Sequence, residues 1–212
     1  NLPLATLGTF VLWLGWFGFN GGSQLAMATR EDVDAISAVF ANTNIAAAAG
    51  VITAVIITQI LYKKIDLTMV LNGALAGLVS ITAGPDYPSM GLAIVIGMVG
   101  AGLAVLAIPM FDKARIDDPV GALSVHLVAG IWGTLAVGIF NPEVSFMTQL
   151  RGVGMIGSFV FFSSFVAWYI IKLVMGLRIS LEGETQGIDI SEFGQMAYTF
   201  DNFQQLNSEG VR

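Results

Sequence analysis

The sequence has no cysteine, one histidine and few charged residues, since only 11% of its 212 residues are Asp, Glu, Lys or Arg. Without cysteine the chain has no disulfide, thiolate metal ligand or cysteine nucleophile. A single histidine excludes a multi-histidine metal cage. There is also no phosphate-binding loop, no His-Glu-x-x-His motif and no carboxylate in the middle of an apolar segment. We therefore expect a protein that is not an enzyme and that has no metal or cofactor.

The low charge accompanies a high apolar content. Hydrophobic residues make up 55% of the chain and its mean hydropathy is +0.78, whereas a soluble domain has roughly 25% charged residues. Most of the surface must therefore face lipid or other helices. The net charge of −6 argues against a nucleic-acid partner.

Six apolar segments are each close to the length that crosses a bilayer, which is about 20 residues for a hydrocarbon core of roughly 30 Å. We therefore predict an all-α polytopic membrane protein with six transmembrane helices. The third segment is short and rich in small residues, and the last is long enough to tilt or to project from the membrane. The six segments are 3–27, 35–61, 67–83, 90–111, 119–140 and 148–176.

The positions of Lys and Arg predict the orientation, because short loops rich in these residues stay cytoplasmic. If residue 1 is cytoplasmic, six basic residues flank the inner ends of the segments and two flank the outer ends. The tail, 179–212, is then cytoplasmic and follows a transmembrane domain at 1–178. The outer loops are acidic, and they either attract cations weakly or are ordinary solvated loops. The inner basic residues are Lys63, Lys64, Lys113, Arg115, Lys172 and Arg178, and the outer ones are Arg30 and Arg151.

The first segment ends in an unusual mixture of aromatic, glycine and polar residues, LGWFGFNGGSQ. On a helix, Trp16, Phe19 or Asn20, and Ser23 share one face. An aromatic ring beside a hydroxyl can seat a small cation, because the ring attracts the charge and the hydroxyl accepts a hydrogen bond. The same residues also fit an interfacial aromatic belt on a helix end softened by glycine, and spacing alone leaves both interpretations open.

His126 is the second candidate, because an ionisable residue inside a membrane segment is a functional-site hypothesis. Its neighbours one turn away on the fifth segment are apolar, so any polar partner comes from another helix. Burial disfavours the charged form, and a neutral imidazole can donate and accept one proton. His126 therefore suits a polar permeant or a proton relay, or else packs against a backbone carbonyl.

Asp117, Asp118 and Pro119 precede the fifth segment. Aspartate at the N-cap with proline at the first helical position is typical of a helix start. We interpret this group as structural.

Four separated motifs resemble those of the ammonium transporter (Amt/MEP/Rh) family, in the same order. The resemblance extends from Asn1 to about Thr199. The motifs are WFGFNGGS at 16–23, DDPVGALSVH at 117–126, GIWGT at 130–134, and RIS at 178–180 with GIDISEFGQMAY at 187–198.

This resemblance implies a homotrimer whose subunits each have eleven membrane helices, arranged as two inverted five-helix repeats and a final long helix. The six segments here would be helices six to eleven, the second repeat and the last helix. The missing amino-terminal half would supply a second pore histidine and a second gating phenylalanine. A closed pore would require that half.

By the same resemblance, Phe19 is similar to the inner of two gating phenylalanines and Ser23 to the hydroxyl of the external ammonium site. Trp16 would line the pore one turn from the gate, and His126 would be one of two lumen histidines. Ammonium or methylammonium would be recruited at the ring and hydroxyl and then deprotonated, and ammonia would cross an apolar pore. Potassium would be excluded because it has no proton to donate.

The resemblance also implies that the protein lies in the plasma membrane with its tail in the cytoplasm. In the family this tail touches a neighbouring subunit and can bind a nitrogen-signalling regulatory protein. Phe193 stands where many members have histidine, which bears on that regulation, and Gly121 stands where some bacterial members have an acidic residue. Residues 201–212 have the composition of a disordered segment. The alternatives to transport are an ammonium sensor with little or no conduction and a structural membrane subunit.

Overall fold

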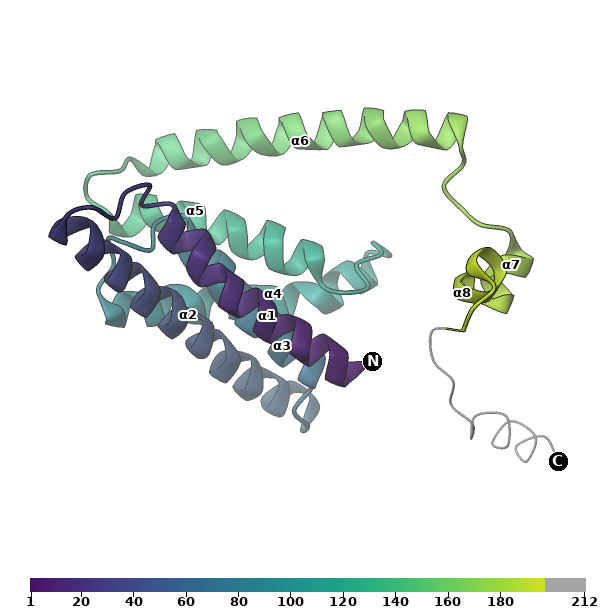
Figure 1. Ribbon diagram of the computed structural model, residues 1–212, viewed down its shortest axis with the longest axis horizontal. Helices are drawn as coiled ribbons and strands as arrows, with labels where there is room; N and C mark the ends of the chain where they lie inside the picture. Colours follow the sequence, from purple (N-terminus) through teal and green to yellow (C-terminus); the bar gives the residue numbers. More distant parts are fainter. Residues whose placement is uncertain (197–212) are drawn as a thin grey trace. The chain divides into compact units, whose positions relative to one another are not determined.

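The computed structural model describes residues 1–196, which form helices joined by short loops with no strand among them (Figure 1). The predicted disordered segment at 201–212 lies outside these residues. A π-helical turn, η1, continues directly into α5. The helices are α1 (Leu2–Gly22), α2 (Arg30–Tyr62), α3 (Leu67–Thr82), α4 (Met90–Lys113), η1 (Leu123–Val128), α5 (Ala129–Phe140), α6 (Phe146–Val174), α7 (Leu181–Gln186) and α8 (Ile188–Phe193).

Five helical stretches are long and apolar enough to cross a membrane, namely α1, α2, α4, η1 with α5, and α6. The third predicted segment, α3, has 16 residues, which span about 24 Å against the roughly 30 Å of a bilayer core. It packs against α1, α2, α4, η1 and α5. The prediction of an all-α polytopic membrane protein is confirmed, with a short third helix surrounded by the others.

Three predicted segment ends differ from the structure by four or five residues. Helix α2 begins at Arg30 rather than at residue 35, after the Thr29 N-cap. Helix α1 ends at Gly22 rather than at residue 27, because the chain turns at Leu25 into the left-handed region with φ 62°. The fifth segment becomes helical at Leu123 rather than at Pro119. Gly121, two residues before Leu123, has a φ of +77°, which is not helical. Glycine adopts this conformation without strain.

Side-chain caps explain where most of the other helices begin. The Asn1 side-chain oxygen Oδ1 accepts a hydrogen bond from the Leu4 N–H at the start of α1. The Asp66 carboxylate accepts from the backbone N–H groups of Thr68 and Met69 at the start of α3. Thr29 and Asp32 form a reciprocal capping box at α2. These caps satisfy backbone donors that have no partner within the first turn of a helix.

Small residues form the core where α2, α3 and α4 meet. An added Cβ at Gly50 would strike the carbonyl oxygen of Gly73, and one at Gly73 would lie 2.5 Å from the Cβ of Ala54. The backbones of α2 and α3 therefore touch, as small-residue interfaces in membranes allow. The fully covered alanines around this contact are Ala46, Ala47, Ala54, Ala76, Ala93, Ala101 and Ala104.

The loop between α3 and α4 is tied to two other helices. The Asn42 side-chain amide donates to the carbonyl oxygens of Pro85 and Pro88 at 3.0 and 2.8 Å. The Tyr87 hydroxyl donates to the Ala136 carbonyl oxygen on α5 at 3.4 Å. Burial, followed by the nearby Asp86 carboxylate, raises the pKa of Tyr87. These contacts fix one end of the bundle of α1 to α5.

The chain divides into two compact units, Asn1–Ile156 and a second that begins at Gly157. The first holds α1 to α5. Helix α6 runs through the boundary and has no buried residue. In the second unit, the Ser180 side chain caps α7 and Arg178 pairs with Glu184 at 3.2 Å. The predicted division at 178/179 falls between α6 and α7 and stays a prediction.

Candidate functional site

The carboxyl-terminal half of α1 is fastened to two neighbouring helices by polar side chains. The Trp16 Nε1–H donates to the Thr82 hydroxyl on α3 at 2.8 Å. One turn later, the Asn20 side-chain amide donates to the Thr43 hydroxyl on α2 at 2.9 Å. Both bonds join residues far apart in the sequence, so they set the rotation of α1 about its axis and hence the direction of Phe19.

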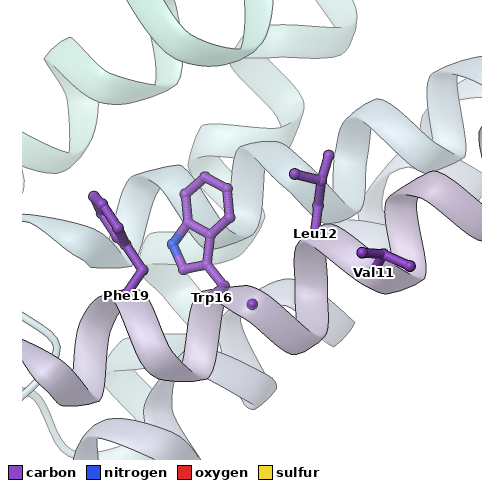
Figure 2. Close-up of a pocket in the computed structure, with 5 residues that line it drawn as sticks. Val11, Leu12, Trp16 and Phe19 are labelled. Carbon is purple, nitrogen blue, oxygen red and sulfur yellow. The ribbon is translucent and has the colours of Figure 1, made fainter.

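Trp16 and Phe19 project from one side of α1 and line a shallow pocket of about 260 Å³ (Figure 2). Their ring centroids are 5.7 Å apart with an interplanar angle of 57°. The remaining lining consists of Val11, Leu12 and Gly15. The pocket is therefore an apolar hollow with two aromatic faces at one end.

Phe19 is 63% exposed in this chain and lies on α1, which is long and apolar enough to cross a membrane. Trp16 is partly buried because its indole reaches toward Thr82. The two rings form a pair in which one is anchored and the other is uncovered. An uncovered ring face beside a pocket can receive a cation or a partner side chain.

Ser23 is the residue that follows α1, and it is exposed. Its hydroxyl donates to the Phe19 carbonyl oxygen at 2.9 Å, so its proton is directed into the helix and its lone pairs remain as acceptors. This bond reaches the main chain of Phe19 and not its ring, so the shared face of Trp16, Phe19 and Ser23 stays a prediction. Ser23 serves as the C-cap rather than lying within the span.

Helical spacing allows Asn20 in place of Phe19 on the face shared with Trp16. In the structure the Asn20 side chain points into the bundle. Its side chain is 2% exposed and Thr43 is fully buried. The Asn20 Oδ1 atom has no hydrogen-bond partner among residues 1–196. Helical spacing alone could not reveal Thr43 as its partner, but an amide in an apolar run is a signal that a polar partner exists.

His126 is the fourth residue of η1 and its side chain is exposed. It makes no hydrogen bond within the described part of the chain, and it does not line the pocket beside Phe19. The structure therefore brings the rings of Trp16 and Phe19 together, whereas neither Ser23 nor His126 lines their pocket. The expectation of a histidine covered by apolar neighbours is not met within this chain, because η1 turns its imidazole away from the packed face.

The Asp118 carboxylate accepts hydrogen bonds at the start of η1. Its oxygens accept from the Leu123 N–H, the Ser124 N–H and the Ser124 hydroxyl, each at 3.1 Å. Pro119 lies in a turn before the helix, so its predicted place in the first helical turn is wrong. The structural interpretation of Asp118 agrees with these bonds, although it acts five and six residues ahead rather than as a direct N-cap.

Residues 1–196 contain no cluster of three or more His, Asp or Glu side chains that could hold a metal ion. The groups that remain for chemistry are the aromatic pair, the Ser23 hydroxyl and the His126 imidazole. Such groups can bind a small cation and exchange a proton with it.

The sequence matches the profile of the Ammonium Transporter Family over residues 1–198. It is 38% identical over 218 residues to the ammonium transporter Amt2 of Archaeoglobus fulgidus, covering 93% of this chain and 46% of that protein. It is 43% identical over 199 residues to a putative ammonium transporter of Synechocystis, covering 92% of this chain and 45% of that protein. The chain thus spans about half the length of these curated relatives.

Solved structures give the same result. A protein described as "Sensor Amt Protein" superposes with a TM-score of 0.83 at 38% identity, covering 91% of this chain and 49% of that one. Saccharomyces cerevisiae Mep2 superposes with a TM-score of 0.76 at 26% identity, covering 86% and 44%. With the matched profile and the helical fold, these likenesses establish that the chain belongs to the Ammonium Transporter Family.

Proposed function

We propose that this chain forms one half of a transmembrane pathway that carries ammonium as ammonia. The observation that carries the proposal is the pairing of Trp16 and Phe19, 5.7 Å apart, with a Ser23 hydroxyl bonded to the Phe19 carbonyl oxygen. In a member of this family, an exposed aromatic face and a free hydroxyl acceptor at one helix end supply the contacts that a small cation needs.

Recruitment would combine two weak interactions. A cation over an aromatic face gains roughly 0.5–2 kcal/mol, and the Ser23 lone pairs can accept one ammonium N–H. An unpaired ion inside an apolar lumen would cost tens of kcal/mol on a Born estimate. Ammonium is therefore deprotonated near Phe19, and neutral ammonia crosses. Potassium, which has no proton to release, is held back.

His126 would meet the permeant further along the pathway. Its exposed imidazole has one donor and one acceptor nitrogen when neutral, and it has no competing partner within residues 1–196. The missing amino-terminal half would supply the opposite wall and the second histidine. Covering this face with other helices would turn an exposed side chain into a lumen residue.

The assembly and location are part of the same proposal. The protein is a homotrimer in the plasma membrane, with the lipid bilayer around it and the tail on the cytoplasmic side. The excess of Lys and Arg at the inner ends of the segments supports this orientation. A nitrogen-signalling regulatory protein would bind the tail, where α8 ends at the exposed Phe193.

The test uses the full-length protein, with the amino-terminal half, in proteoliposomes on a solid-supported membrane. An ammonium pulse is applied to wild type and to His126→Ala. We expect a transient current in wild type that is lost in the variant, which would establish charge-coupled transport through His126. A full current in the variant would remove His126 from the pathway. No current in either, with ammonium still bound, would favour a sensor or electroneutral conduction.

A further inference from the structure

The π-helical turn that carries His126 is unusual in an otherwise α-helical bundle. Helix η1 covers Leu123–Val128 and runs directly into α5. A π-turn contains one residue more than an α-turn and is less stable by itself, so such turns are rare and are found often at functional sites. His126 lies within the turn, so the turn affects where the imidazole points.

The extra residue rotates His126 relative to α5. Each residue of an α-helix advances about 100° and each residue of a π-turn roughly 80°. Over the three steps from His126 to Ala129, this changes the direction of His126 by about 60°. The packed face of α5 contains the buried residues Ala129, Gly133 and Ala136. An α-helix would turn His126 toward that face, whereas the π-turn turns it away.

The burial pattern agrees with this geometry. Ser124 and Val125 are fully covered, at 0% and 1% exposure, while His126 and Leu127 are exposed. The turn thus buries a serine and a valine and presents the histidine on the open side. The open side is where the missing half would close the pathway.

Asp118 holds the beginning of this turn. Its carboxylate accepts from two backbone N–H groups, those of Leu123 and Ser124, and from the Ser124 hydroxyl. The next N–H, that of Val125, donates to the Gly121 carbonyl oxygen at 2.8 Å. The opening donors of the π-turn are therefore satisfied by a side chain from the preceding loop, which an unsupported helix start would leave unpaired.

Gly121 lets the chain bend so that Asp118 can reach. Its φ of +77° is in the left-handed region, and an added Cβ would lie 2.6 Å from the Asn72 side-chain nitrogen on α3. The loop is consequently pressed against α3, and the Asp118 carboxylate is brought over the start of η1.

We propose that Asp118 is a positioning residue that stabilises the π-turn and thereby directs His126 to the open face. The effect of this positioning on transport rests on the proposed function. If that function holds, the imidazole meets the permeant only when the π-turn is intact. Asp118 itself does not contact the permeant. The neighbouring Asp117 is exposed and makes no hydrogen bond in the described residues, so it supplies a matched control.

The first test measures the direction of residue 126 without depending on transport. The chain has no cysteine, so His126→Cys introduces one thiol, in a full-length protein whose other half has been freed of cysteine. The rate of its reaction with a positively charged methanethiosulfonate reagent is compared in three backgrounds: unchanged, Asp118→Ala and Asp117→Ala. We expect a several-fold slower reaction with Asp118→Ala and no change with Asp117→Ala.

The second test measures ammonium flux with His126 present. With Asp118→Ala we expect the maximal rate to fall roughly tenfold, because misplacing a reacting group is costly, while the half-saturating ammonium concentration stays constant because the α1 site is untouched. Asp117→Ala should keep both values. If Asp118→Ala does not fold, Ser124→Ala replaces it in both tests. It removes one of the three bonds and should give smaller changes in the same direction.

The outcomes separate this inference from the proposed function. An unchanged thiol reaction rate in Asp118→Ala would overturn the positioning role, even if the protein conducts ammonium. A slower reaction in a protein that conducts no ammonium would support the positioning role and contradict the proposed function. Equal effects of Asp117→Ala and Asp118→Ala would also overturn the inference, because the bonds belong to Asp118 alone.

Discussion

Ser23 shows how a single residue can be bound to the fold and still be available to a ligand. Its hydroxyl donates to the Phe19 carbonyl oxygen, so the side chain is held in place while its oxygen can still accept a hydrogen bond. This arrangement links the position of the acceptor to the position of the Phe19 ring. The two halves of the proposed recruiting site therefore move together.

Ser23→Ala should weaken ammonium binding by roughly tenfold, because a hydrogen bond to a charged group is worth about 1.5–3 kcal/mol and part of it is replaced by water. The measurement is the ammonium dependence of transport in proteoliposomes. Ser163→Ala is the matched control, since the Ser163 hydroxyl makes the same bond to the Phe159 carbonyl oxygen on α6. An unchanged half-saturating concentration in Ser23→Ala would exclude Ser23 from the site.

The sequence predicts which residues of α1 lie near one another, but not which residues of other helices they bond. The spacing of Trp16, Phe19 and Ser23 follows from the helical period. The structure pairs the rings of Trp16 and Phe19 and makes Ser23 the C-cap of α1. Thr82 and Thr43, which fix the rotation of α1, lie on other helices. One sequence has no information about which threonine a buried indole or amide will meet, so these contacts needed the structure.

Helix boundaries and local helix type depend on backbone conformation and hydrogen bonds, which cannot be read from the pattern of apolar residues. The length of the apolar stretches predicted six segments, and the middle of each is helical. The end of α1 and the start of η1 differ because Leu25 and Gly121 adopt positive φ. The π-turn could not be predicted, because it depends on hydrogen bonds from Asp118 to Leu123 and Ser124 rather than on composition.

The contact of α2 with α3 predicts how sensitive this interface is to one methyl group. Gly73→Ala should lower the free energy of unfolding by about 1–3 kcal/mol, because its Cβ would meet Ala54 and the Gly50 backbone and such overpacking forces the helices apart. Gly8→Ala, at an open helical position, should be neutral or gain up to about 1 kcal/mol. Thermal unfolding in detergent distinguishes them, and equal melting temperatures would contradict the close backbone contact.

The loop between α3 and α4 predicts an alkaline pH dependence. The pKa of Tyr87 is raised by burial and then by Asp86, so the neutral form is favoured in the fold. This contribution to stability is complete below the unfolded pKa of about 10 and is lost as pH rises through the folded value. The melting temperature of wild type should therefore fall more steeply above pH 10 than that of Tyr87→Phe. Parallel curves would contradict the raised pKa.

At the scale of the whole molecule, composition was the most informative feature. Few charges and long apolar segments predicted a polytopic membrane protein, and the fold and the family match confirm it. The Ammonium Transporter Family consists of transporters and not enzymes, which confirms that prediction as well. Four ordered motifs predicted the family itself.

The site could be predicted only in part, because the pathway that we propose needs residues beyond those of this chain. This chain covers about half the length of its relatives, and Phe19 and His126 are both exposed. The homotrimer, the second histidine and the regulatory partner stay predictions.

The most direct test is the ammonia flux of the full-length protein in liposomes that hold a pH-sensitive dye. Entry of ammonia consumes protons and raises the internal pH. We predict that wild type raises it faster than protein-free liposomes do, and that His126→Ala slows it while ammonium binding is retained. Ammonium binding with a wild-type rate equal to that of protein-free liposomes would contradict transport and identify a sensor.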